Sequence, residues 1–427
     1  MPQYTVHTSW LFDPKLKSAR QNVSVTVNTV SGLIERVYER ESADATLQPG
    51  DIDLRGKYVL PGLVDAHTHV FLHSYDEAGA LKQKRDESMT ERIVRAVNHC
   101  RTALLAGYTT YRDLGSEGMQ ECDASLRDAI ARGLTPGPRL FVATRVLAST
   151  GAFECRTENA GGGHCLPASA DAVDGPAECR QAVRRRIAAG ADVIKFFADY
   201  RRRIMRSPPA VQHPYKASVL HPPAEPNPDY LVFDDEEMRM IVAEAALARC
   251  PVAAHCCTLE GALAAVEAGA NTIEHVYFVS DELFTRMAEK RVVFVPTLAV
   301  AEKLHSARFR SAILPQTKRA FDLGVRLACG GDTGTYRHGD NVRELELMIE
   351  AGIPAADVLE ACTVGGWESC GGDLCGRRFG WFEEGLQADI IAVEQDPTTV
   401  TGALRDISFV MKDATVWKLD GNPQGMV

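Results

Sequence analysis

The sequence predicts an α/β protein: a (β/α)8 barrel, the TIM-barrel architecture, with a small β-sandwich domain formed by the N- and C-terminal segments. Two observations support this fold class. Short apolar strands alternate with helical patterns through the middle of the chain, and strands with alternating apolar and polar residues occur at both ends. We expect residues 1–56 and 376–427 to form the composite β-sandwich domain and residues 57–375 to form the barrel.

The two terminal segments have the period of half-buried antiparallel strands. The N-terminal strands are expected at Tyr4–Val6, Val23–Val27 and Leu33–Val37. The C-terminal strands are expected at Ala388–Val393, Ile407–Val410 and Ala414–Trp417. Strands from opposite ends of a chain can pair in one small domain, which leaves the middle of the chain as a separate unit.

The middle of the chain repeats a strand and then a helix. The predicted strands are Tyr58–Thr68, Tyr108–Leu114, Arg139–Leu147, Asp192–Phe197, Pro251–His255, Asn271–His275, Val292–Leu298 and Arg326–Asp332. The predicted helices include Asp86–Leu105, Ala177–Ala189, Asp234–Arg249 and Leu259–Ala268. The run Asp234–Glu237 places carboxylates at the positive end of a helix dipole. Eight strand–helix units in sequence favour a closed parallel barrel over an open sheet.

Composition and charge limit the partners. The formal net charge of −10 disfavours a polyanion such as DNA. No apolar run approaches the length of a membrane span, and the first residues lack the pattern of a signal peptide. The twelve cysteines have the scattered spacing of thiols in a reducing compartment. We expect a cytoplasmic homo-oligomer with a small-molecule substrate, and a secreted form that has lost its signal peptide stays the alternative location.

Six polar residues lie at the ends of predicted barrel strands, where barrel enzymes place their active sites. They are His67, His69, Lys195, His255, His275 and Asp332. Each has an ordinary structural explanation, such as a hydrogen-bonded core histidine, an ion-paired lysine or an aspartate that caps a turn. Their common position at one end of the barrel favours a metal centre instead, because imidazole suits ions such as zinc.

Lys195 needs a chemical explanation, because an ammonium group would be repelled by two metal cations. Carbon dioxide converts a lysine amine into a carbamate, an anion whose two oxygens can bridge two ions. Such a pair lowers the pKa of bound water toward neutrality, and we expect Asp332 to accept the proton.

These residues resemble those of the amidohydrolase superfamily. The resemblance rests on the segments Leu60–His69, Val193–Phe196, Ala254–His255, Ile273–His275 and Gly331–Asp332. Two further segments, Gly107–Asp113 and Thr135–Arg139, are similar to the imidazolonepropionase-like and prolidase-like branch, and most closely to its fungal ochratoxinase type.

The resemblance implies a centre of two divalent ions per chain, with zinc as the expected metal. His67 and His69 would bind the first ion and His255 and His275 the second. Lys195, N6-carboxylated by carbon dioxide, would bridge them, and Asp332 would complete the first site and act as general base.

Two features bear on the substrate. His164 matches a histidine that other members use near the scissile carbonyl, and an exposed loop histidine is the alternative. Cys256 and Cys257 stand where many bacterial relatives carry alanine and tyrosine, and we expect both thiols to pack beside the site without binding metal.

The segment after Lys195 is basic in an acidic chain. Arg201, Arg202 and Arg203 are expected to bind a substrate carboxylate, and pairing with acidic groups of a neighbouring subunit is the alternative. The resemblance therefore implies cleavage of the amide bond in N-acyl amino acids or peptides, in the manner of a carboxypeptidase, including ochratoxin A to ochratoxin α and phenylalanine.

Four alternative functions share this fold. A lactonase or phosphotriesterase would use the same six ligands, and a cyclic-amide hydrolase of the same fold is a further alternative. A mononuclear deaminase or imidazolonepropionase would lack the lysine, and a non-catalytic scaffold would have lost ligands.

Overall fold

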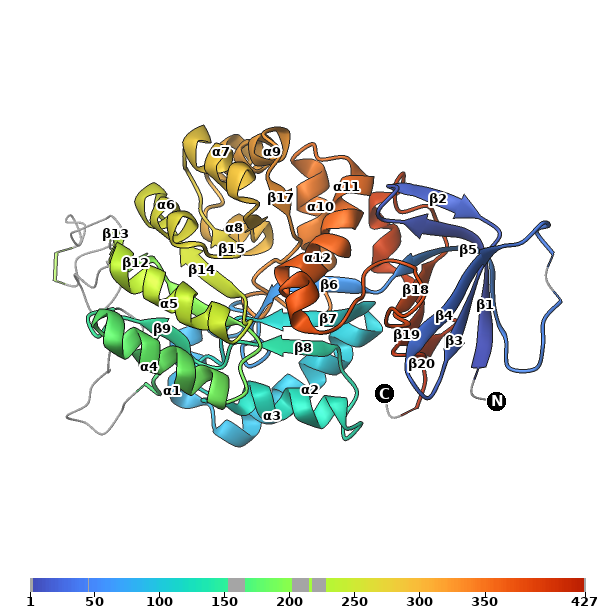
Figure 1. The fold of residues 1–427 in the computed structure, drawn as a ribbon, viewed down its shortest axis with the longest axis horizontal. Helices are drawn as coiled ribbons and strands as arrows, with labels where there is room; N and C mark the ends of the chain where they lie inside the picture. The colour runs from blue at the N-terminus through green and yellow to red at the C-terminus, as the bar shows by residue number, and fades with distance from the viewer. Residues whose placement is uncertain (1–2, 45, 153–165, 202–214, 217–227, 426–427) are drawn as a thin grey trace.

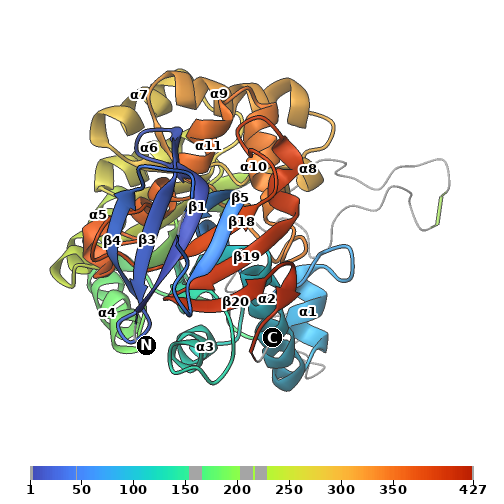
Figure 2. The same ribbon diagram turned by 90° about the vertical axis from the view of Figure 1, so that its right-hand side faces the viewer.

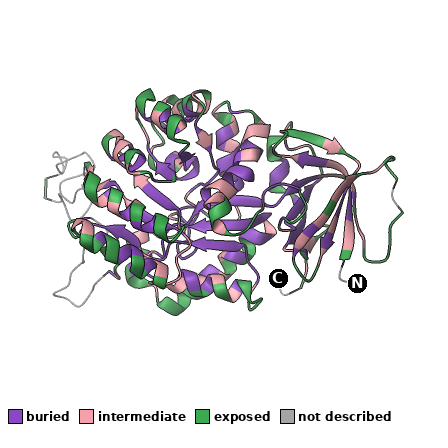
Figure 3. Cartoon of the chain, viewed as in Figure 1, coloured by how far each residue is buried: buried purple, intermediate pink, exposed green. Residues whose placement is uncertain are grey.

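The computed structural model describes residues 3–44, 46–152, 166–201, 215–216 and 228–425. A sheet built from both ends of the chain lies at one end of the molecule, and strands wrapped by helices form the remainder (Figure 1). The strands of this second part are buried, while the helices around them turn exposed residues outward (Figure 3). This is the layered arrangement that the alternation of predicted strands and helices indicates.

The terminal sheet has nine strands in the order β21-β20-β19-β18-β5-β1-β3-β4, with β2 paired to β1. Figure 2 shows its strands side by side. The N-terminal strands are β1 (Gln3–Asp13), β2 (Ser18–Gln21), β3 (Val23–Asn28), β4 (Leu33–Glu39) and β5 (Ile52–Pro61). The C-terminal strands are β18 (Ile390–Val393), β19 (Ile407–Lys412), β20 (Thr415–Leu419) and β21 (Asn422–Pro423). The predicted pairing of the two ends is confirmed, as one hydrogen-bonded sheet in place of two.

The parallel strands follow barrel order but form two sheets. One contains β6 (Leu63–Thr68), β7 (Tyr108–Asp113) and β8 (Arg139–Val142). The other contains β9 (Val146–Ala148), β10 (Ala170–Ala172), β11 (Ile194–Phe197), β14 (Val252–Cys256), β15 (Thr272–His275), β16 (Val293–Val295) and β17 (Arg326–Leu327). A separate hairpin joins β12 (Asp199–Arg201) to β13 (Asp229–Leu231).

The gaps between the two sheets have local causes. Thr144, between β8 and β9, has a φ of 60° and donates its N–H to Asp123 at 2.7 Å, which takes it out of the ladder. At the other gap single backbone bonds connect β6 to the segment after β17, including Ala66 N to Cys329 O at 2.8 Å. The strands thus have the order predicted for a closed barrel. They form two sheets joined by single backbone hydrogen bonds at the gaps, and not one continuous sheet.

Helices cover the outside of the strands. They are α1 (Ala80–Asp86), α2 (Met89–Leu105), α3 (Cys122–Ala131), α4 (Gly175–Ala188), α5 (Asp235–Leu247), α6 (Leu259–Ala268) and α7 (Asp281–Lys290). They continue with α8 (Leu298–Leu304), the π-helix η3 (Phe309–Ile313), α9 (Leu314–Asp322), α10 (Val342–Glu350), α11 (Ala355–Ala361) and α12 (Val364–Ser369). Two 3-10 helices, η4 (Gly372–Cys375) and η5 (Thr401–Arg405), follow.

The helix start predicted at Asp234 is confirmed. Its carboxylate accepts from the N–H groups of Glu236 and Glu237, and the Glu237 carboxylate accepts from the Asp234 N–H at 2.8 Å. This capping box satisfies backbone donors that the helix itself leaves free.

The first predicted strand is divided in two. Residues 58–61 belong to β5 in the terminal sheet, and β6 begins at Leu63. Gly62 lies between them, and a Cβ there would come within 2.2 Å of Thr109 Oγ1, so only glycine allows the chain to pass. The domain boundaries proposed from the sequence stay a prediction.

Arg139 connects the two parts of the molecule. Its guanidinium, 9% exposed, donates to Asp389 Oδ2 at 2.8 Å and also pairs with Asp413 Oδ1 at 2.5 Å. Arg139 begins β8, while both aspartates flank strands of the terminal sheet. A buried charge cluster therefore fixes the terminal sheet against the barrel strands.

The described cysteines are free thiols, and most are buried. Among the described residues, no helix is both long and apolar enough to cross a membrane.

Candidate metal centre

The structure brings together the six residues found at predicted strand ends. His67 and His275 have ring centroids 4.8 Å apart, and the rings of His255 and His275 are 4.5 Å apart. The ring of His69 lies 5.4 Å from that of His67. Asp332 Oδ1 lies 3.3 Å from His69 Nε2 and 3.8 Å from His67 Nε2. The four histidines and the aspartate thus form one cluster, which draws on β6, β14, β15 and the segment after β17.

Lys195, on β11, lies at the same cluster. Lys195 is paired with Ala253 of β14, two residues before His255, so the Lys195 and His255 side chains share one face of the sheet, and the charge of Lys195 contributes to the low pKa of His67, His255 and His275. Lys195 is 3% exposed, and its Nζ has no hydrogen-bond partner among the residues that the structure describes. A buried amine without a partner is costly, which indicates that the site is built for a further group.

Protein acceptors fix the orientation of three histidine rings. Nδ1 of His67 lies 2.8 Å from Glu274 Oε2, and Nδ1 of His69 lies 3.0 Å from the carbonyl of Gly115. Nδ1 of His275 lies 2.8 Å from Thr297 Oγ1. An acceptor at Nδ1 leaves the lone pair at Nε2, which is the arrangement of metal-binding histidines.

Glu274 is a residue of this cluster that the strand-end argument missed. It is fully buried, accepts from Arg112 Nη2 at 2.8 Å, and is also hydrogen-bonded by Thr272 Oγ1 and His67. Arg112 is likewise fully buried and donates to the carbonyl of Ala66 at 2.6 Å. This buried ion pair holds the strand that carries His67 and orients its ring. The signal in the sequence was a charged residue within each of two short predicted strands, Arg112 in Tyr108–Leu114 and Glu274 in Asn271–His275.

Unusual backbone conformations occur at two of the proposed ligands. Asp332 has a φ of 62° and His275 has a φ of 71°, both in the left-handed region that non-glycine residues seldom adopt. A Cβ at Gly330 would lie 2.6 Å from the His67 backbone nitrogen, so glycine lets the chain pass directly beside β6. Such conformations persist where packing holds them, and they are typical of functional sites.

Burial and local charge set the protonation of the cluster. Burial, followed by the charge of Lys195, lowers the pKa of His67 well below its usual range. Burial also lowers the pKa of the Lys195 amine to about 8. For His69 the effect of burial is outweighed by Asp332 and Glu117, which raise its pKa to about 9. His67, His255 and His275 are therefore neutral, the form that binds metal, whereas His69 holds a proton against Asp332 that a metal ion would displace.

The donor set fits divalent ions. His67, His275 and Asp332 each offer one ligand atom, and these atoms lie within 4.8 Å of one another. Asp332 Oδ1 is buried without a hydrogen-bond partner among the described residues, although His69 is near. Imidazole nitrogens with carboxylate oxygens are the ligands that zinc and similar ions prefer.

Arg201 is the only one of the three predicted substrate-binding arginines within the described part of the chain. It ends β12, and its guanidinium lies 4.9 Å from the ring centroid of Tyr200. The Tyr200 ring in turn lies 5.1 Å from the ring of His255, so Arg201 lies near the cluster. Arg202, Arg203 and His164 fall outside the described residues, and their roles stay predictions.

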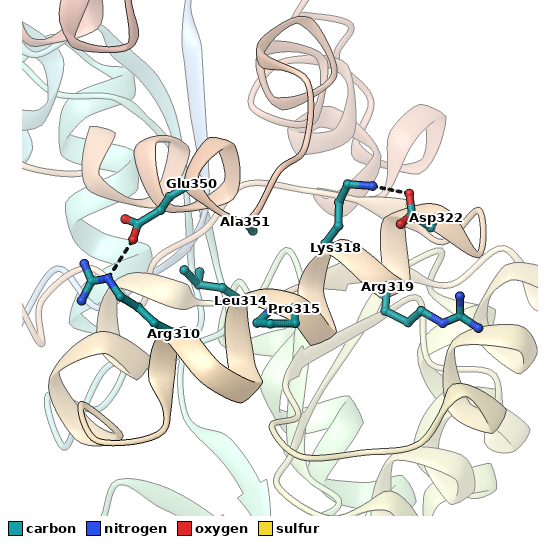
Figure 4. Close-up of a pocket in the computed structure, with 8 residues that line it drawn as sticks. All are labelled: Arg310, Leu314, Pro315, Lys318, Arg319, Asp322, Glu350 and Ala351. Carbon is teal, nitrogen blue, oxygen red and sulfur yellow. Dashed lines mark hydrogen bonds and ion pairs between the residues drawn. The ribbon is translucent and has the colours of Figure 1, made fainter.

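A hollow on the outer surface is separate from this cluster. It is lined by charged residues of η3, α9 and α10, and Figure 4 shows them around Leu314 and Pro315. Arg310 pairs with Glu350 at 2.9 Å and Lys318 with Asp322 at 2.5 Å. Because these charges satisfy one another and no predicted ligand lines the hollow, it is not the reactive site.

Comparison with known proteins places the chain in a family. The pattern of the amidohydrolase family matches residues 58–419, and the chain belongs to this family. It is 28% identical to ochratoxinase from Aspergillus niger over 402 residues, which cover 84% of this chain and 74% of that protein. It is therefore a hydrolytic enzyme of the class that acts on amide bonds, a family whose members generally bind divalent metals.

Solved structures show the same fold. A Xaa-Pro dipeptidase with bound methionine superimposes with a TM-score of 0.79 at 26% identity, over 97% of this chain and all of that one. The structure of A. niger ochratoxinase gives a TM-score of 0.78 at 24% identity, over 98% and 96% of the two chains. The resemblance drawn from the sequence is confirmed at the level of the family and of its ochratoxinase and prolidase relatives.

Proposed function

We propose that this protein is a binuclear metal-dependent amidohydrolase that cleaves the amide bond of N-acyl amino acids or peptides, in the manner of a carboxypeptidase. The observation that carries the proposal is the cluster of four histidines, Lys195 and Asp332, in which three Nδ1 atoms have protein acceptors and the lysine amine has no described partner. A bound ion or a covalent modification would account for a buried amine without a partner.

Two divalent ions, zinc by preference, would be held by this donor set. His67, His69 and Asp332 would bind the first ion and His255 and His275 the second, with Lys195 as an N6-carboxylated bridge. When bound, such ions lower the pKa of water and polarise a carbonyl oxygen. Asp332 is placed to accept a proton, since its Oδ1 is buried and directed at the histidines.

Aromatic side chains beside the cluster support a substrate with a bulky, flat acyl group. The ring of Phe197 lies 4.7 Å from that of His255, and Tyr200 lies 5.1 Å from it. Tyr277 lies on the other side, 6.4 Å from His275. Aromatic rings contribute apolar area and stacking to a ligand site.

Arg201 supports recognition of a free carboxylate at the other end of the substrate. Its guanidinium stacks on Tyr200, the ring that also contacts His255, so the charge is held at the site. Arginine binds carboxylates through paired hydrogen bonds. The ochratoxinase relative makes ochratoxin A, an amide of phenylalanine, the first substrate to test.

Metal analysis and a matched pair of substrates test the proposal. Elemental analysis is expected to give two divalent ions per chain. N-acyl-phenylalanine is expected to be hydrolysed with a higher kcat/KM than its C-terminal amide. One ion in a fully active chain would refute the binuclear centre, and equal rates on the two substrates would refute carboxylate recognition.

Arg201 can be tested by substitution. Arg201→Gln is expected to lower kcat/KM for the acid by roughly 10–150-fold, the value of a charge-assisted hydrogen bond, and to leave the amide substrate unaffected. Arg319→Gln is the control, because Arg319 pairs with Asp281 on the outer surface at 2.6 Å. Equal loss in both variants would contradict the assignment.

The lactonase, phosphotriesterase and cyclic-amide activities are separated from this function by the same assay. A lactone, a phosphotriester and a cyclic amide are included, and faster turnover of one of these would replace the proposal. Light scattering of the purified protein tests the homo-oligomer, and fractionation of its host tests the cytoplasmic location.

A further inference from the structure

A thiol lies at the second half of the metal centre. Cys257 Sγ is 3.2 Å from His255 Nε2, the ring nitrogen expected to bind the second ion. Nitrogen and thiolate ligands of one tetrahedral zinc ion are about 3.5 Å apart, given bonds of about 2.0 and 2.3 Å. The observed contact is a hydrogen bond whose length is within about 0.3 Å of the spacing of two co-ligands, so little movement would bring both atoms onto one ion. Cys257, His255 and Asp199 also offer one ligand atom each within 4.8 Å of one another.

Asp199 is not the third ligand, because protein donors occupy both of its oxygens. Oδ1 accepts from the Cys257 N–H at 2.6 Å, and Oδ2 accepts from the Thr258 N–H and hydroxyl at 3.0 and 2.6 Å. A Cβ at residue 261 would lie 2.0 Å from Oδ2, so Gly261 lets the start of α6 close over this carboxylate. Asp199 thus fixes the backbone of Cys257 and with it the direction of the thiol.

Lys195 gives a second, independent indication of a ligand at this point. Its amine is buried and without a described partner, and its charge acts on both His255 and Cys257. Lys195 is also paired with Ala253, two residues before His255, so its side chain and that of His255, whose Nε2 contacts the thiol, lie on the same face of the sheet. The adjacent Cys256 differs, because it is fully buried and its thiol is directed at the carbonyl of Ala254, 3.8 Å away.

We propose that Cys257 is a sulfur ligand of the second divalent ion, together with His255, and that Asp199 positions it. This inference rests on the proposed binuclear centre. It replaces the expectation that both cysteines only pack beside the site, and keeps that role for Cys256. On binding, the thiol releases its proton to the solvent and the thiolate donates an electron pair to the metal. A soft sulfur ligand would favour zinc over magnesium or manganese at this half of the centre.

Cobalt substitution tests the proposal spectroscopically. The protein is stripped of metal with a chelator and reloaded with two equivalents of Co²⁺, and the near-ultraviolet spectrum is recorded. Wild type is expected to show a thiolate-to-cobalt charge-transfer band. Cys257→Ser is expected to lose it and to hold its second ion at least about 10-fold more weakly, since even outer partners of ligands are worth that much. Cys256→Ser is the matched control and is expected to keep both the band and the affinity.

A second measurement needs no variant. Wild type is treated with iodoacetamide with and without two equivalents of zinc, and alkylation of the peptide that carries Cys256 and Cys257 is mapped by mass spectrometry. Zinc is expected to protect Cys257. Two bound ions without a charge-transfer band and without protection would overturn the sulfur ligand while leaving the proposed function intact. Failure to take up metal would overturn both, and a band that persists in Cys257→Ser would assign it to another thiol.

Discussion

Replacing Glu274 by glutamine removes one charge from the centre with little change of shape. The carboxylate accepts from both Arg112 Nη2 and His67 Nδ1, each at 2.8 Å, and both partners are buried. A glutamine offers one oxygen and one NH2 group. The ion pair is lost in either orientation because the charge is gone, and the amide oxygen is expected to turn toward Arg112 and Thr272, which both donate to Oε1, so that the His67 Nδ1–H faces the NH2 group and loses its acceptor.

The contacts of Glu274 set the size of two separate effects. Arg112 and Glu274 are both 0% exposed, and breaking a buried ion pair costs about 3–5 kcal/mol of folding free energy. His67 loses the acceptor that orients it, and removal of such a partner weakens metal binding by about 10–100-fold, or roughly 1.4–2.7 kcal/mol. Glu274→Gln is therefore expected to be less stable without metal and also to bind one ion more weakly.

Competition with a chromophoric chelator measures the metal affinity, and thermal unfolding of the metal-free protein measures the stability. Asp389→Asn is the control, because it disrupts a buried pair with Arg139 of the same length, 2.8 Å, away from the histidines. The control is expected to lose stability and to keep its metal affinity. Wild-type affinity in Glu274→Gln, or an equal loss in Asp389→Asn, would refute the role of Glu274 in orienting His67.

Three further predictions concern the bridge, the base and the pH dependence of stability. Lys195→Ala is expected to lose bound metal and activity, and bicarbonate with a short carboxylic acid is expected to restore part of both; full metal content in the unrescued variant, by elemental analysis, would contradict the bridge. Asp332→Asn is expected to keep much of its metal while kcat falls about 10²–10⁴-fold, and a near-normal kcat would show that another residue takes the proton. Burial raises the pKa of Glu344 to about 8, although the N–H groups of Leu298 and Ala299 donate to it. The folded state therefore holds a proton that the unfolded chain releases near its ordinary pKa of 4.5. The resulting stabilisation is complete below that value and is lost as the pH rises to about 8. Thermal unfolding is expected to show wild type losing stability relative to Glu344→Gln between pH 5 and 8, and a constant difference would place the pKa in its usual range.

Local patterns in the sequence predicted the elements well where one short segment carries all the information. Helix α6 begins and ends where its apolar pattern does, at Leu259 and Ala268, and α5 begins at its acidic cap. The strand ends that carry the histidines were also visible, because a polar residue that closes an apolar run stands out.

Features that depend on distant residues could not be predicted. Glu274 and Arg112 are 162 residues apart, and Arg139 and Asp389 are 250 apart, so no local window contains either pair. The seams of the barrel depend on backbone torsions, such as the φ of 60° at Thr144, that residue type alone does not specify. The direction of the Cys257 thiol depends on Asp199, which lies on another strand.

The pairing of β5 with β18 has a consequence for the order in which the chain folds during synthesis. Leu60 on β5 pairs with Ile391 on β18, so the middle of the terminal sheet joins segments made far apart in time. At about 5–20 residues per second, a ribosome needs roughly 16–66 s to pass from one strand to the other. Throughout that interval the emerging β5 exposes an unpaired edge on one side. The nascent chain is therefore most open to aggregation and to chaperones before its last strands leave the ribosome.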